Sequence, residues 1–228
     1  MVKANDNIKM IEEIVSIVGP LVESLIFVGG SVVSFYIERA DHEEFRPTDD
    51  VDAVVHVSTL MDYYEIDQKL RNVGFQNCNK KGAPICRYIH GKLIFDVTPD
   101  DINILGFSNP WYRNGCKEAI EVDLPAGSSI KILSLPYFLC TKIEAFNTRG
   151  SDDLIFSHDL EDISFVLRSL LDAKSILNGP SEVQAYLRKF FRRIIRDFGY
   201  IDYLYGEYPG TRDGQIDAEH MVDFLKSL

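Results

Sequence analysis

The stretch LIFVGGS, residues 25–31, places four apolar residues directly before two glycines and a serine. A short apolar run that ends at such a turn predicts a buried strand. The two glycines permit a backbone with positive φ and a close approach to a ligand. Ser31 would then open a helix over 32–39, whose first N–H groups suit a phosphate. We therefore predict that Gly29, Gly30 and Ser31 form a phosphate-binding turn.

Two aspartates lie at the start of a second predicted strand, residues 51–57. Asp50 and Asp52 are two positions apart, so their side chains point to the same face of that strand. A third aspartate, Asp96, interrupts the apolar residues of a strand predicted over 92–97. A charge at such a position is costly to bury unless it is paired or binds a metal ion.

Three carboxylates on two neighbouring strands suit a pair of hard cations. Mg²⁺ prefers a few carboxylates together with the phosphates of a substrate. One of two such ions can activate an attacking oxygen, and the other can steady a triphosphate and its leaving pyrophosphate. We therefore predict that Asp50, Asp52 and Asp96 are catalytic residues that bind Mg²⁺, or Mn²⁺ in its place.

The remaining sequence pattern predicts a mixed α/β part followed by a helical part. The first part would hold a helix, a second helix capped by Ser58, a hairpin around His90-Gly91 and a further strand pair, over residues 7–18, 58–73, 84–97 and 119–133. The pattern after Ser134 predicts helices over residues 135–148, 158–171, 180–197 and 217–227. The predicted fold class is therefore α/β (α+β), with a mixed sheet flanked by helices in a domain over 1–134 and a helical C-terminal domain over 135–228.

Charge and composition limit the partners and the cellular location that we expect for the protein. The 228-residue chain carries 35 acidic and 24 basic side chains, a net charge of −11, so a nucleic acid would need a local basic patch to bind. No apolar run reaches the roughly 20 residues of a membrane span, and the polar N-terminus does not resemble a signal peptide. The cysteines show no C-x-x-C spacing, which favours reduced thiols over a zinc site or disulfides. We therefore expect a cytoplasmic protein without a membrane partner.

The glycine turn and the three aspartates resemble a known signature. The motifs of the DNA polymerase β-like nucleotidyltransferase superfamily are similar to FVGGS at 27–31, DVD at 50–52 and Asp96. In that superfamily the Gly-Ser turn binds phosphate and the three acids hold the catalytic metals. The resemblance implies transfer of a nucleoside monophosphate from a substrate NTP to an acceptor hydroxyl.

A later segment narrows this resemblance. KIEAF at 142–146 and HDLEDI at 158–163 are similar to the third and fourth motifs of the AbiEii-type toxin branch. In that branch the lysine is associated with the triphosphate and the first aspartate of the fourth motif with the active site, which implies these roles for Lys142 and Asp159. The resemblance to this branch also implies that the protein is the toxin of a toxin–antitoxin or phage-defence pair, with a cognate antitoxin as its partner. Some relatives modify the 3′ end of tRNA, which implies an RNA acceptor.

The chain departs from the pattern at two places. Residues 32–49 make the spacing between Ser31 and Asp50 longer than is usual in the superfamily, and they include Arg46, which could reach a phosphate. His158 stands where many relatives have an arginine.

Two other functions fit the same residues. The first is an antibiotic-type nucleotidyltransferase, in which an acidic pocket would bind a cationic small molecule such as an aminoglycoside. The second is a non-catalytic nucleotide-binding module that acts through a partner. The presence of all three carboxylates argues against the second alternative.

Some candidate residues also have a purely structural interpretation. Lys142 fits a surface lysine whose stem lies along a helix. Asp159 fits a carboxylate that is stabilised at a helix N-terminus. Asp100 and Asp101 fit solvated turn residues after the strand that carries Asp96.

The densest basic cluster lies in the predicted helix 180–197. Arg188, Arg192 and Arg196 are spaced so that they share one helix face, and Lys189 and Arg193 lie beside them. This face is either the exposed side of an amphipathic helix or a contact surface for the phosphates of an RNA acceptor.

Overall fold

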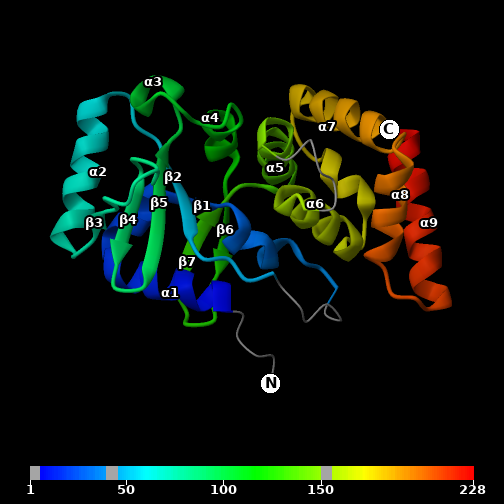
Figure 1. The fold of residues 1–228 in the computed structure, drawn as a ribbon, viewed down its shortest axis with the longest axis horizontal. Coiled ribbons are helices and arrows are strands. Elements are labelled where there is room, and N and C mark those ends of the chain that lie inside the picture. Colours follow the sequence, from blue (N-terminus) through cyan, green and yellow to red (C-terminus); the bar gives the residue numbers. More distant parts are fainter. Residues whose placement is uncertain (1–5, 40–45, 150–155) are drawn as a thin grey trace. The chain divides into compact units, whose positions relative to one another are not determined.

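The chain folds into two compact units, shown in Figure 1. The residues that the computed structural model describes are 6–39, 46–149 and 156–228. The first unit, called the sheet unit below, comprises Met1–Phe35 and Glu43–Ser134. The second, called the helical unit, comprises Leu135–Leu228 together with Tyr36–His42. The chain therefore contributes to the helical unit twice.

The sheet unit contains one mixed sheet, whose described strands number seven and follow the order β3-β4-β5-β2-β1-β7-β6. β2 is parallel to β5 and β1 is parallel to β7, while the other neighbours are antiparallel. Figure 1 shows the central strands side by side. The strands are β1 (Leu25–Val28), β2 (Val51–Val55), β3 (Gln76–Asn77), β4 (Arg87–His90), β5 (Leu93–Pro99), β6 (Ile120–Asp123) and β7 (Ser129–Ile132). The predicted α/β class, with a mixed sheet flanked by helices, is confirmed.

One face of the sheet carries the aromatic core of the unit. The Phe27 and Phe95 rings stack with their centroids 6.3 Å apart, and Phe75 packs against Phe95 at 5.7 Å. All three side chains are buried. Successive side chains of a strand point to opposite faces, so Asp96, the neighbour of Phe95, points away from this core.

Two helices attach to the sheet, at the places the sequence predicted. α1 (Asp6–Val18) packs against β2 and β5 and buries Ile11 and Ile14 completely. α2 (Leu60–Asn72) is tied to β5 by a hydrogen bond of 2.8 Å from the Tyr63 hydroxyl to the backbone carbonyl of Val97.

The predicted cap of α2 is wrong by one residue. Thr59, not Ser58, is the N-cap, because its hydroxyl accepts the Asp62 N–H while the Asp62 carboxylate accepts the Thr59 N–H. This reciprocal pair satisfies two backbone donors at once.

The segment after the glycine turn also differs from the prediction. An α-helix was expected over 32–39, but the structure has a 3₁₀ helix, η2, over Gly30–Tyr36. Val32 and Val33 are both buried there, and β-branched side chains lower the propensity for an α-helix. The 3₁₀ form suits such a short connection, because the chain passes into the helical unit at Tyr36.

Four helical elements of the sheet unit are too short to show a hydrophobic period in the sequence, so they were not predicted. They are η1 (Gly19–Ser24), α3 (Ile102–Leu105), α4 (Tyr112–Gly115) and η3 (Cys116–Glu118). None of the four cysteines is paired in a disulfide in the structure: Cys78, Cys86, Cys116 and Cys140.

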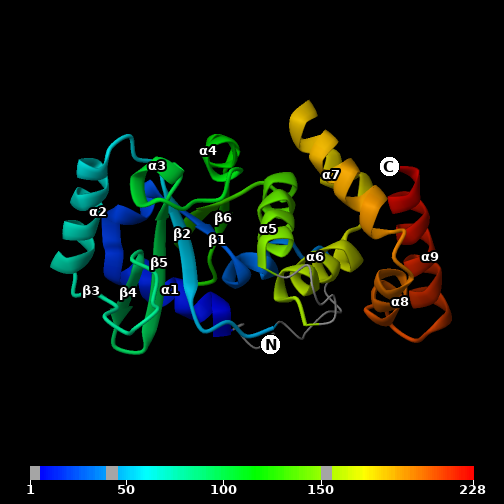
Figure 2. The same cartoon turned by 45° about the horizontal axis from the view of Figure 1, so that its top comes forward.

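The helical unit confirms the helical C-terminal part. Its described elements are α5 (Leu135–Arg149), α6 (His158–Ser169), η4 (Ala173–Leu177), α7 (Ser181–Ile194), α8 (Phe198–Gly206) and α9 (Arg212–Ser227). α5 packs against α6 and α7, and α9 packs against α6, α7 and α8 (Figure 2). α8 has no counterpart among the predicted helices, because its aromatic residues and the glycines near its ends give a low helix propensity. Within the described parts of the chain, no helix is long and apolar enough to cross a membrane.

The segment Tyr36–His42 is held in the helical unit by contacts of its described residues. These are ring packing of Tyr36 on Phe138 at 4.3 Å, a hydrogen bond of 2.6 Å from the Leu171 N–H to the Glu38 carboxylate, and an ion pair of Arg39 with Asp217.

The aromatic core yields a stability prediction. Phe95→Ala should lower the free energy of unfolding by about 3–5 kcal/mol, since it removes a buried ring and leaves a cavity between two others. Urea denaturation followed by circular dichroism measures this loss. The control is Ile85→Ala at a side chain that is 65% exposed, and an equal loss in both variants would contradict the assignment of Phe95 to the core.

Candidate metal and nucleotide site

Strand register gathers the three predicted acids of the sheet unit on one face. Asp52 of β2 lies directly opposite Asp96 of the parallel strand β5. Asp50 precedes Asp52 by two residues and therefore projects to the same side. Val28, the last residue of β1, lies opposite Asp52, which places the glycine turn beside this acid.

An arginine that the sequence analysis did not single out lies among these acids. Arg87 is opposite Asp96 on the antiparallel strand β4. Its Nη2 donates to Oδ2 of Asp50 at 2.8 Å and to Oδ2 of Asp96 at 2.7 Å, and its Nε donates to Oδ1 of Asp96 at 2.8 Å. Two carboxylates thus converge on one cationic nitrogen.

The acids keep Arg87 charged. The hydrogen bonds with Asp96 raise the pKa of Arg87 well above its usual value, against the opposing effect of partial burial. Attraction by Asp96, Asp50 and Asp52 adds to the rise. A guanidinium that is already protonated at ordinary pH cannot leave these acids by losing its proton.

Asp50 is positioned by the segment that leads into β2. The Thr48 hydroxyl donates to Oδ1 of Asp50 at 3.1 Å. The Thr48 N–H in turn donates to the side chain of Asn7 at 3.1 Å, and Asn7 donates to the backbone carbonyl of Arg46 at 3.0 Å. Asn7 is buried in α1, so this helix fixes the approach of the chain to the site.

Gly29 is required where it stands. Its φ is +79°, and a Cβ added there would lie 2.2 Å from Oδ2 of Asp52. The backbone of the predicted turn therefore approaches a carboxylate of the site as closely as only glycine allows. Ser31 is buried and its hydroxyl donates to the Val28 carbonyl oxygen at 3.4 Å, whereas Gly29 and Gly30 are half-buried. The glycines are therefore more accessible to a ligand than this hydroxyl.

Lys142 and Asp159 form a second group, which belongs to the helical unit. The Lys142 ammonium lies 2.6 Å from Asp162 and 3.4 Å from Asp159. Arg149 donates twice to Asp159, at 2.9 and 3.1 Å. Lys142 is only 6% exposed, so its interpretation as a surface lysine is wrong. Lys142, Asp159 and Asp162 thus form a buried ion cluster, which Arg149 joins from the surface with a side chain that is 71% exposed.

Asp159 stands in the first turn of α6, after the N-cap Ser157. Burial alone would raise the pKa of this carboxyl, but the hydrogen bonds from Arg149 and the attraction of Lys142 outweigh it and lower the pKa below the usual 3.8. Asp159 is therefore more than a carboxylate at a helix N-terminus, because it anchors this ion cluster.

The oxygen donors of the sheet unit fit a hard cation, although a guanidinium now lies between two of them. Across residues 6–39, 46–149 and 156–228, no three His, Cys, Asp or Glu side chains are close enough to hold a metal ion as they stand. The convergence of Asp50 and Asp96 on Nη2 of Arg87 nevertheless shows that both carboxylates can face one positive charge. A metal ion at this place requires Arg87 to move.

The interpretation of Asp100 as a solvated residue is wrong. Asp100 is buried, accepts the Val57 N–H and lies 2.6 Å from Nδ1 of His56. It therefore fastens the chain where β2 and β5 end. Asp101 instead caps α3 through Asn103.

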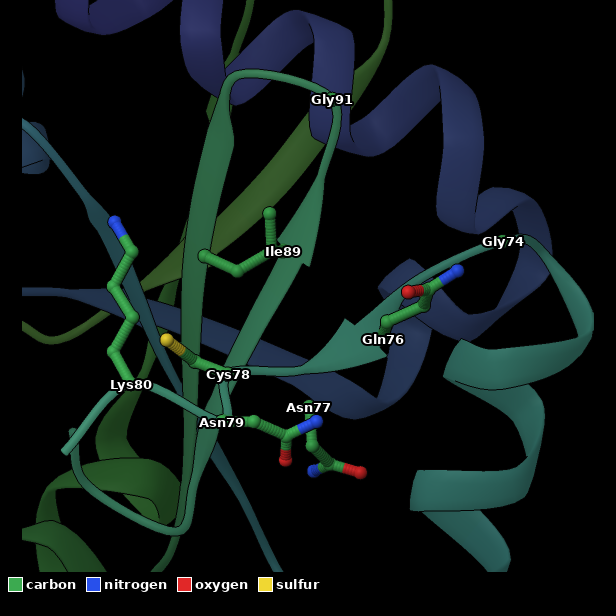
Figure 3. Close-up of a pocket in the computed structure, with 8 residues that line it drawn as sticks. All are labelled: Gly74, Gln76, Asn77, Cys78, Asn79, Lys80, Ile89 and Gly91. Atoms are coloured by element: carbon green, nitrogen blue, oxygen red, sulfur yellow. The ribbon is translucent and has the colours of Figure 1, made fainter.

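A hollow of about 390 Å³ lies at the outer edge of the sheet, beside β3 (Figure 3). None of the predicted site residues lines it. Its wall is formed by Gly74, Gln76, Asn77, Cys78, Asn79, Lys80, Ile89 and Gly91. Ile89 and Arg87 are two residues apart on β4, so the hollow and the acids lie on the same face of the sheet.

The basic cluster of α7 is exposed as predicted. Lys189, Arg192 and Arg193 are exposed on α7, and Arg188 is half-buried. The helix ends at Ile194 rather than at the predicted residue 197, so Arg196 is exposed in the turn that follows and does not continue the helix face. The opposite face of the helix buries Val183, Leu187, Phe190, Phe191 and Ile194. The exposed arc, called the α7 basic face below, forms a positive surface on an acidic protein.

No protein-family model matches the chain, and no curated protein matches it either.

The buried ion cluster generates a stability prediction. Lys142→Met should cost about 3–5 kcal/mol at pH 7, because it removes the ammonium that lies 2.6 Å from the buried Asp162 and leaves Asp159 with Arg149 as its cation. The low pKa of Asp159 means that its ion pairs stabilise the wild type above the usual carboxyl pKa, and that this stability is lost as the pH falls through the lowered value. The cost of Lys142→Met should therefore shrink towards pH 3, where protonation removes the uncompensated charges.

Thermal and urea unfolding across pH 3–7 test this prediction. Lys226→Met is the matched control, since Lys226 is exposed and lies 3.8 Å from Asp223. Equal stability of the two variants at pH 7 would sink the idea of a buried ion cluster.

Proposed function

We propose that the protein is a metal-dependent nucleotidyltransferase, which moves a nucleoside monophosphate from NTP to an acceptor hydroxyl. One observation carries the proposal: Asp52 of β2, Asp96 of β5 and Asp50, which directly precedes β2, share a sheet face beside the glycine turn that follows β1. This arrangement brings hard oxygen ligands next to a half-buried glycine turn whose backbone suits a phosphate. It also agrees with the resemblance to the polymerase β-like superfamily.

Each residue of the site has a proposed part in the reaction. Bound Mg²⁺ or Mn²⁺ would supply Lewis acidity towards the phosphates and the attacking oxygen. Asp50 and Asp52 would hold both ions, while Asp96 would complete one site and accept the proton of the acceptor hydroxyl. Gly29 and Gly30 would present backbone to the triphosphate.

Lys142 has a competing role in stability. The resemblance assigns it to the triphosphate and assigns Asp159 to the active site. In the helical unit both are engaged in the same ion cluster, so contact of Lys142 with a phosphate would require it to exchange Asp162 for the new anion. The assignment remains a prediction from the resemblance alone.

The proposed acceptor is RNA, such as the 3′ end of tRNA, and the proposed biological role is that of a toxin neutralised by a cognate antitoxin. The support for RNA is the α7 basic face, because a protein of net charge −11 must concentrate positive charge where a polyanion binds. The alternative is a small cationic acceptor, which would not need this surface.

One observation favours a second candidate function, a non-catalytic nucleotide-binding module. Arg87 already neutralises part of the carboxylate cluster, as a residue that permanently replaced a metal ion would. Such a module would bind NTP without a divalent cation and would transfer nothing.

Asp52→Asn tests the enzymatic function. The substitution keeps the shape of the side chain but removes a charge that metal binding needs, so transfer should fall by a factor of about 10³ or more. The measurement is the label transferred from each α-³²P-labelled NTP to total cellular RNA, protein or small molecules in the presence of Mg²⁺. Asp123→Asn, an exposed acid on β6, is the matched control and should keep wild-type transfer.

Wild-type transfer rates in Asp52→Asn would rule out the carboxylate site. Metal-independent NTP binding without any transfer by the wild type would instead support the non-catalytic module.

The acceptor has its own test. Arg192→Glu combined with Arg196→Glu should reduce RNA labelling severely, because the protein loses contacts to RNA phosphates. With fewer contacts, binding releases fewer counterions, so RNA binding should also depend less steeply on salt concentration. NTP binding should barely change. The control is Lys174→Glu combined with Lys226→Glu, which changes the net charge equally at two exposed residues outside the α7 basic face. Full RNA labelling by the first pair would exclude this surface, and labelling of small molecules alone would identify the other acceptor class.

A further inference from the structure

Arg87 lies at the point where two carboxylates of the site converge. A single nitrogen, Nη2, is 2.8 Å from Asp50 and 2.7 Å from Asp96, and Nε adds a second bond to Asp96. A divalent cation that binds to these carboxylates would meet the same oxygens. The guanidinium and the metal ion therefore compete for one set of ligands.

The backbone of Arg87 is fixed while its side chain has a way out. The Cys78 N–H donates to the Arg87 carbonyl at 2.9 Å, and the Arg87 N–H donates to the Pro84 carbonyl at 3.1 Å. The side chain is 26% exposed, so rotation about its own bonds can carry the guanidinium towards solvent. Movement of this one side chain is enough to free the carboxylates, without any change of the strand.

The charge balance favours an exchange. One guanidinium faces Asp50 and Asp96 directly and is also attracted by Asp52, so it compensates only part of the negative charge. A triphosphate brings oxygens that a guanidinium binds in a bidentate manner, as it now binds Asp96. Arg87 can therefore keep a strong partner after it leaves the acids.

From these contacts we propose that Arg87 is an exchangeable counter-ion, which holds the carboxylates in the absence of substrate and transfers to the triphosphate when metal ions bind. The inference rests on the proposed nucleotidyltransferase function and adds that the binding of metal ions depends on the binding of the triphosphate. Metal ions alone bind weakly, because they must displace a permanent cation. Metal and triphosphate bind with positive cooperativity, since each makes room for the other.

The test is a Mn²⁺ titration of the full-length protein, in which electron paramagnetic resonance reports the free ion. Inorganic tripolyphosphate serves as the second ligand, because it carries the phosphate charges without a choice of base. Arg87→Gln should bind Mn²⁺ about tenfold more tightly than the wild type when no phosphate is present, because a nearby like charge is gone. Tripolyphosphate should tighten Mn²⁺ binding by a factor about ten times larger in the wild type than in the variant. A protein-free titration gives the Mn²⁺ that tripolyphosphate binds by itself, and this amount is subtracted.

Two further variants sharpen the result. Arg113→Gln breaks another arginine–aspartate pair of the sheet unit, the one with Asp101 at 2.9 Å, and should leave Mn²⁺ affinity unchanged. Arg87→Lys keeps the charge but loses the planar fork, so its Mn²⁺ affinity should fall between the wild type and Arg87→Gln. This variant carries the test if Arg87→Gln does not fold.

The outcomes separate the inference from the proposed function. If Asp52→Asn abolishes Mn²⁺ binding but Arg87→Gln binds no more tightly than the wild type, the counter-ion role is wrong and the metal site stands. If no variant binds Mn²⁺ with or without tripolyphosphate, the proposed function fails and the inference fails with it.

Discussion

Repulsion between carboxylates on one face of the sheet is the constraint on which the sheet unit depends. Asp52 and Asp96 lie directly opposite each other in a parallel pair, and Asp50 projects to the same side. Like charges in such register destabilise a sheet, so compensation of the charge stabilises the pairing of these strands. Arg87 provides this compensation from the next strand, and the aromatic core on the opposite face stabilises the pairing. The same repulsion would favour a bound cation, as the proposed function requires.

The elements that carry the acids could be predicted from the sequence, but the partner of Asp96 could not. Apolar runs placed β1, β2 and β5 correctly, and alternation placed Asp50 and Asp52 on one face. The hairpin was predicted to turn at His90-Gly91, whereas the structure turns one residue later, at Gly91-Lys92. A turn shifted by one residue moves the cross-strand partner by two. The predicted turn would set Ile85 opposite Asp96, and the actual turn sets Arg87 there.

Two other features depend on tertiary contacts that no local pattern contains. The glycine turn was predicted because it suits a phosphate, yet the residue that now requires Gly29 is Asp52, from another strand. Lys142 and Asp159 carry motif-like spacing, but their burial follows from the packing of α5 on α6 and from Arg149 at the end of α5. The resemblance identifies these residues without indicating that they compensate each other. Sequence patterns therefore identified the charged residues better than they identified the charges' partners.

The segment Tyr36–His42 makes the helical unit discontinuous in the chain. Tyr36 packs on Phe138, and Arg39 pairs with Asp217, near the other end of the polypeptide. A fragment that begins at Leu135 would therefore lack one of its own core side chains and an ion pair. During synthesis on the ribosome, Tyr36 and Arg39 emerge long before α5 and α9. The sheet unit can therefore form while these two residues still lack their partners Phe138 and Asp217. The order of translation thus favours folding of the sheet unit first, with the helical unit completed only when the last helix is released.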